Sequence, residues 1–215
     1  MTQNNLGNAL AEQGRRAGGA ESRRLLGEAV QAYRLALQVR MREKLPQEWA
    51  VTQNNLGNAL AEQGWSASGA ESRRLLGEAV QAYRLALQVR TREELPQQWA
   101  AAQSNLGNVL AEQGRRASGA ESRRLLGEAV QAYRLALQVY TREELPKDWA
   151  NTQNNLGDAL QEQGHRAEGV EIVRLLGEAA QSYILALEAN PDEERAIAQA
   201  FKLYQEHLFE FEKAH

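Results

Sequence analysis

The sequence contains no cysteine, and only four of its 215 residues are proline. Without cysteine there is no disulfide framework, no thiol nucleophile and no thiolate ligand for a metal. Aromatic residues make up 6% of the chain, which leaves little material for a β-sandwich, whereas the good helix formers Leu, Ala, Glu, Gln and Arg are abundant. We therefore expect an all-α protein.

The chain also lacks a large excess of charge of either sign. Lys and Arg total 25 against 28 Asp and Glu, and the formal net charge is −3. This balance is too even to indicate a nucleic-acid or membrane footprint, and the sequence contains no leader-like start and no apolar run of about 20 residues. We expect a cytoplasmic protein that binds neither nucleic acid nor membrane.

Motifs that carry catalysis or hold cofactors are missing as well. The sequence has no G-x-S-x-G, H-E-x-x-H or P-loop pattern. Its histidines, His165, His207 and His215, are scattered and show no metal-ligand spacing. The sequence thus predicts a non-enzymatic protein with no catalytic residue, no cofactor and no metal site.

The dominant feature that is present is a repeat with a period of 50 residues. The first two copies differ at only seven positions, and the fourth diverges, especially after Leu187. Such periodicity is typical of arrays in which each unit buries its apolar face against its neighbours. The copies are 1–50, 51–100, 101–150 and 151–191.

Each copy carries the signals of two helices. A proline suited to a first helical turn opens a helix expected over 46–63, which Gly64 should end. Ser68 with Glu71 has the spacing of a capping box, so a second helix is expected over 69–94. Leu95 precedes a proline, which disfavours the α conformation and separates this helix from the next copy. Four helical hairpins follow.

The end of the chain has a different residue pattern from the four copies. Apolar residues recur at steps of four and three from Ile197 to Phe211, as on one face of a helix. We expect residues 192–213 to form a capping helix that covers the last hairpin.

These residues resemble the tetratricopeptide repeat family. The match consists of the Leu56-Gly57 pair, Ala79 with Tyr83 four residues later, and the small residue Ala86. The period exceeds the family's usual length of about 34 residues, and the phrase around Leu56 is most similar to the long-period units of the kinesin light chain type and of bacterial multidomain regulators. The resemblance implies a single domain, 1–215, folded as a right-handed α-solenoid of four helix-turn-helix repeats plus the capping helix.

The resemblance also implies that the first helix of each hairpin lines a concave surface on which ligand peptides lie. Polar residues at helical spacing on that helix are then the candidate peptide-binding residues. They are Asn4, Asn5, Asn8, Asn54, Asn55, Asn58, Glu62, Ser104, Asn105, Asn108, Glu112, Asn154, Asn155 and Asp158. A row of carboxamides offers both donors and acceptors to the backbone of a protein or peptide partner, whatever its side chains.

Two other interpretations stay open at this stage. The asparagines can be solvated polar residues copied with the repeat, although asparagine is a mediocre helix former and three within five residues lack an evident stabilising reason. Alternatively, the first copy has no hairpin before it to cover its apolar face, and the chain is a structural array that self-associates into homo-oligomers through this N-terminal end.

Overall fold

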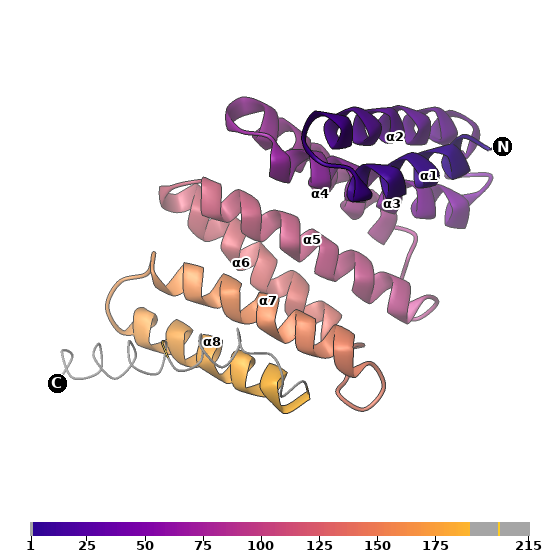
Figure 1. Cartoon of the computed structure of the whole chain (residues 1–215). Coiled ribbons are helices and arrows are strands. Elements are labelled where there is room, and N and C mark those ends of the chain that lie inside the picture. The colour runs from indigo at the N-terminus through magenta and orange to yellow at the C-terminus, as the bar shows by residue number, and fades with distance from the viewer. Residues whose placement is uncertain (1, 190–201, 203–215) are drawn as a thin grey trace. The chain divides into compact units, whose positions relative to one another are not determined.

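The computed structural model describes residues 2–189 and residue 202, and it shows an all-α protein (Figure 1). This confirms the expected fold class, because these residues form α-helices and no strand. Between residues 2 and 189 the helices are α1 (Gln3–Arg16), α2 (Gly19–Val39), α3 (Pro46–Ser66), α4 (Gly69–Leu87), α5 (Pro96–Arg116), α6 (Gly119–Ala136), α7 (Pro146–Gly164) and α8 (Val170–Ala189).

The helices pack as consecutive hairpins. The helices α1 and α2 pack on each other, as do α3 and α4, and α7 and α8. Successive hairpins are in contact too, because α2 packs on α3 and α6 packs on α7. Within each of these two pairs, the hairpins bury apolar surface against each other, which is how helical-repeat proteins obtain a core.

The chain divides into two compact units, residues 1–109 and 110–215, with the boundary inside α5. The single domain and the right-handed superhelix remain predictions. The expected capping helix at 192–213 falls almost wholly outside the described residues.

Glycine allows the closest contact within each hairpin. A Cβ atom on Gly57 of α3 would lie 2.9 Å from Cε1 of Tyr83 on α4, closer than side chains tolerate. The Tyr83 ring is only 2% exposed, and Ala79 and Ala86 of the same helix are fully buried. The two helices of this hairpin therefore cross closely at small residues.

The expected helix boundaries were wrong in two places. Gly64 does not end α3, which continues to Ser66. Glycine at this position instead allows a close contact, since an added Cβ would lie 2.7 Å from Cδ2 of Leu76. The helix α4 ends at Leu87 rather than at residue 94. The chain needs the following residues for the turn that leads to Pro96.

The predicted capping box does not form. Ser68 is the N-cap residue of α4, but its side chain makes no capping hydrogen bond, and the next residue, Gly69, has a φ of +57°. Glycine adopts this left-handed conformation without steric cost. The serine that stabilises the connection is Ser72, whose hydroxyl donates to the carbonyl of Gly64 at 2.7 Å.

Candidate functional site

The asparagines of α1, α3 and the first part of α5 are joined by hydrogen bonds across successive hairpins. The Oδ1 atom of Asn8 accepts from the hydroxyl of Tyr33 at 2.9 Å and from Nδ2 of Asn55 at 3.1 Å. One hairpin further on, Oδ1 of Asn58 accepts from the Tyr83 hydroxyl at 2.7 Å and from Nδ2 of Asn105 at 3.3 Å. We call Asn8, Asn55, Asn58 and Asn105 the asparagine ladder.

The ladder corrects the view that these asparagines lack a stabilising reason. Each tyrosine is buried, and its hydroxyl needs an acceptor that the carboxamide supplies. The second bond then links the carboxamides of neighbouring hairpins. The sequence analysis did not pair Tyr83 with an asparagine. A usable signal was present, because Asn58 and Tyr83 recur together in three of the copies and an Asp–Tyr pair takes their place in the fourth.

The same bonds determine which atoms of the ladder remain available. Among the described residues, Nδ2 of Asn8 and of Asn58 has no hydrogen-bond acceptor, and Oδ1 of Asn55 and of Asn105 has no donor. Because Oδ1 is fixed by the tyrosine, the free amide nitrogen has a fixed direction. The ladder therefore alternates free donors and free acceptors.

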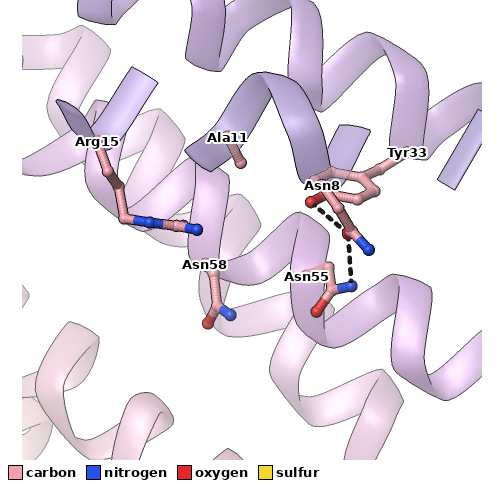
Figure 2. A pocket seen from close by; sticks show the side chains of 6 residues that line it. All are labelled: Asn8, Ala11, Arg15, Tyr33, Asn55 and Asn58. Atoms are coloured by element: carbon pink, nitrogen blue, oxygen red, sulfur yellow. Dashed lines mark hydrogen bonds between the residues drawn. The ribbon is translucent and has the colours of Figure 1, made fainter. Parts of the chain in front are cut away.

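A small pocket of about 250 Å³ opens on the ladder in the first unit. Figure 2 shows its lining, in which the side chains of Asn8, Asn55 and Asn58 and the guanidinium of Arg15 border the same space. Ala11 and Tyr33 complete the wall. The pocket is polar and open to a ligand that makes hydrogen bonds.

Charges at the edge of the pocket are paired. The Arg15 guanidinium lies 2.7 Å from Oε2 of Glu12 and 3.2 Å from Oε1 of Glu62. Burial raises the pKa of the Glu62 carboxyl, and the hydrogen bond from Arg15 opposes this only in part. Burial also raises the pKa of the Tyr33 hydroxyl to about 12, so this group remains a donor to Asn8 at neutral pH.

Asn4 and Asn54 require a correction, because both were expected on the open inner surface. Asn4 is 5% exposed and its Oδ1 accepts from the hydroxyl of Thr52 at 3.1 Å, whereas Asn54 is 9% exposed. The Asn4 side chain lies on the part of α1 that the next hairpin covers, and Asn54 occupies the same repeat position on α3. Helical spacing alone did not distinguish this buried flank from the neighbouring exposed face.

The remaining candidates on α1 and α5 differ in exposure. Asn5 is exposed, and its backbone N–H is capped by the Thr2 hydroxyl at 3.4 Å. Ser104 and Asn108 are half-buried.

In the second unit, Asp158 accepts a hydrogen bond from the Tyr183 hydroxyl at 2.7 Å, as Asn58 does from Tyr83. Asn154 and Asn155 are half-buried, and Oδ1 of Asn154 is buried without a partner among the described residues. Burial of Glu112 acts to raise its pKa, but hydrogen bonds from Arg115 and Arg116 outweigh this, so the pKa is lowered.

Comparison with protein families found none that matches the chain, and comparison with curated proteins found no relative. The likeness to tetratricopeptide repeats thus remains a resemblance. Across residues 2–189 and 202, none of the helices combines the length and the apolar character that crossing a bilayer requires.

Proposed function

We propose that the protein is a non-enzymatic interaction module that binds an extended peptide along the asparagine ladder. The observation that carries the proposal is the alternation of free Nδ2 donors and free Oδ1 acceptors, which the internal bonds hold in fixed directions. An extended peptide backbone presents N–H and C=O groups in alternation and is the complementary ligand. Because the contacts are to the backbone, side-chain specificity arises elsewhere, with Glu62 and Glu112 as candidates.

The expected affinity follows from the number of bonds. Each hydrogen bond contributes about 0.5–1.5 kcal/mol net, so several must act together. Micromolar binding, about −8 kcal/mol, is a reasonable value for one peptide.

The fourth hairpin suggests the substitution that tests the proposal. Asp158 accepts from Tyr183 at the place where Asn58 accepts from Tyr83. Asn→Asp therefore keeps the internal bond, replaces the free donor with an acceptor oxygen and adds a negative charge. The double variant Asn8→Asp with Asn58→Asp loses two donors, together about 1–3 kcal/mol, or roughly 5- to 150-fold in affinity.

The experiment uses the full chain to select from a displayed library of random 12-residue peptides and then measures the Kd of the enriched peptides by calorimetry. We expect the double Asn→Asp variant to bind these peptides at least fivefold more weakly at both low and high salt, which excludes simple charge repulsion.

The matched control is Tyr33→Phe with Tyr83→Phe, which removes the tyrosine bonds to Asn8 and Asn58 and keeps every carboxamide. We expect this variant to lose stability but to bind more tightly than the Asn→Asp variant. Equal binding by the wild type and the Asn→Asp variant, or no enriched peptide, would refute the proposal.

One observation favours a second candidate function, self-association of a structural array. On the outer face of α1 and α2, Leu6 is 39% exposed and Leu35 is 45% exposed, whereas Leu56, the counterpart of Leu6, is 7% exposed under the preceding hairpin. A second copy that packs on this face would bury the same leucines.

Sedimentation velocity over a range of about 1 to 100 µM, the scale of a weak dimer, tests this candidate. We expect a concentration-dependent dimer that the Leu6→Glu and Leu35→Glu changes abolish. A monomer at all concentrations rejects self-association and leaves the peptide-binding proposal unaffected.

A further inference from the structure

A buried threonine joins the first two hairpins. Thr52 of α3 is fully buried, and its hydroxyl oxygen accepts from Nη1 of Arg40 at 3.1 Å. The hydroxyl also lies 2.8 Å from the carbonyl oxygen of Glu48 and 3.1 Å from Oδ1 of Asn4. One side chain thus connects a cation at the end of the first hairpin, an amide of α1 and the start of α3.

The corresponding position in the next hairpin is Ala102, which is also fully buried. Its neighbours by repeat position are Asn54, equivalent to Asn4, and Arg90, equivalent to Arg40. Asn54 is 9% exposed and Arg90 is 7% exposed. Alanine at position 102 thus removes the hydroxyl at the centre of this joint, whereas the asparagine and the arginine are retained.

The removal leaves polar atoms without protein partners. Among the described residues, Oδ1 of Asn54 and Nε of Arg90 are buried and make no hydrogen bond. Arg40 has Oε2 of Glu48 at 3.3 Å from its Nε, whereas Arg90 has Gln98 at that repeat position. Burial lowers the pKa of Arg90. A buried donor or acceptor left unpaired is strongly destabilising.

A water molecule fits the requirements of this joint. Replacing threonine by alanine removes one oxygen and one methyl carbon, about the space of a single water. Water can accept from arginine as the threonine hydroxyl does. The Thr52 hydroxyl has one hydrogen for two nearby acceptors, the Glu48 carbonyl oxygen and Oδ1 of Asn4. A water molecule has two hydrogens, one for each acceptor at the corresponding positions. Buried waters typically make about three such bonds.

We infer that the joint between the second hairpin and the start of α5 binds one internal water molecule at Ala102, held by the Arg90 guanidinium and Oδ1 of Asn54. The site is distinct from the asparagine ladder and does not rest on the proposed peptide binding. It provides the link between these hairpins that Thr52 provides in the preceding joint.

The test compares two isosteric substitutions in the full chain, Ala102→Thr and Ala102→Val, by thermal unfolding. Threonine replaces the water with a hydroxyl, so the midpoint should stay within about 2 °C of the wild type. Valine expels the water and leaves both polar atoms unpaired, so the midpoint should fall by roughly 5 °C. A high-resolution crystal structure should show a water oxygen about 3 Å from Oδ1 of Asn54.

Other results overturn the inference. If the atoms are unpaired and no water binds, Ala102→Thr raises the midpoint well above the wild type. If the space is already filled by protein, threonine and valine lower the midpoint equally. The joint at Thr52, between the first two hairpins, supplies a control. Water can replace the lost hydroxyl in Thr52→Ala but not in Thr52→Val. The valine variant should therefore be the less stable of the two.

Discussion

The contact between Gly57 and Tyr83 gives the sharpest prediction for stability. In the Gly57→Ala variant the new Cβ would lie 2.9 Å from Cε1 and 3.0 Å from Cδ1 and Cζ of the Tyr83 ring. The ring has little freedom to move, because it is 2% exposed and its hydroxyl is held by Asn58 at 2.7 Å. Overpacking of this kind costs about 1–3 kcal/mol.

Helix propensity acts in the opposite direction, since alanine is favoured over glycine by about 1 kcal/mol in a helix interior. We expect a net loss of up to about 2 kcal/mol for Gly57→Ala. Gly127 is the matched control, because its added Cβ would meet only Nε2 of Gln163 at an ordinary 3.6 Å. Gly127→Ala should therefore gain about 0.5–1 kcal/mol.

Urea unfolding followed by circular dichroism measures both variants, and an unchanged m-value shows that the change lies in folded-state stability. A double-mutant cycle with Tyr83→Leu isolates the steric contribution, because removal of the ring should abolish most of the cost of Gly57→Ala. If Gly57→Ala stabilises the protein as much as Gly127→Ala does, the close crossing has no energetic role and the reasoning fails.

Further predictions concern the connection and two glutamates. Ser72→Ala should cost about 1–2 kcal/mol in urea unfolding, because Ser72 is 1% exposed and its hydroxyl donates to Gly64; an unchanged midpoint would contradict this. The pKa of Glu62 is raised in the folded state, so its contribution to stability falls as the pH rises above 4.5, the pKa in the unfolded chain. The change in folding stability caused by Glu62→Gln should therefore be more favourable at neutral pH than in acid. The lowered pKa of Glu112 has the opposite sign: its contribution is present above the unfolded value and is lost as the pH falls through the folded pKa, so Glu112→Gln should cost stability at neutral pH only. Thermal melts between acid and neutral pH check both, and parallel pH profiles for the two variants would refute the assignment.

The hairpins could be predicted from the sequence because their signals are local. A proline fixes the start of α3, and Leu45 before it lies outside the α region, with φ of −137° and ψ of 59°, because a following proline disfavours the α conformation. The end of α4 could not be predicted, since the residues after Leu87 include good helix formers and leave the helix only because the chain must reach the next hairpin. The capping box at Ser68 failed because Gly69 adopts a positive φ, which a spacing pattern does not reveal.

The candidate site was predictable to a similar degree. Helical spacing placed Asn55 and Asn58 on one face of α3, where both take part in the ladder. The same spacing could not show that the next hairpin covers the flank that holds Asn54. The tyrosine hydroxyl bonds to a helix of the same hairpin 25 residues earlier, and that separation becomes visible only once the helices are packed.

Comparison of the copies separates what the fold needs from what is available to a ligand. In the fourth hairpin Asp158 accepts the bond from Tyr183 at 2.7 Å, the same length as the bond from Tyr83 to Asn58. The position therefore requires an acceptor oxygen, and the carboxamide nitrogen adds nothing to this bond. At Asn8 and Asn58 the fold needs the Oδ1 atom, and the bonds to this atom hold the free Nδ2 donor in place. Such a donor is suited to a ligand because its orientation costs no entropy on binding.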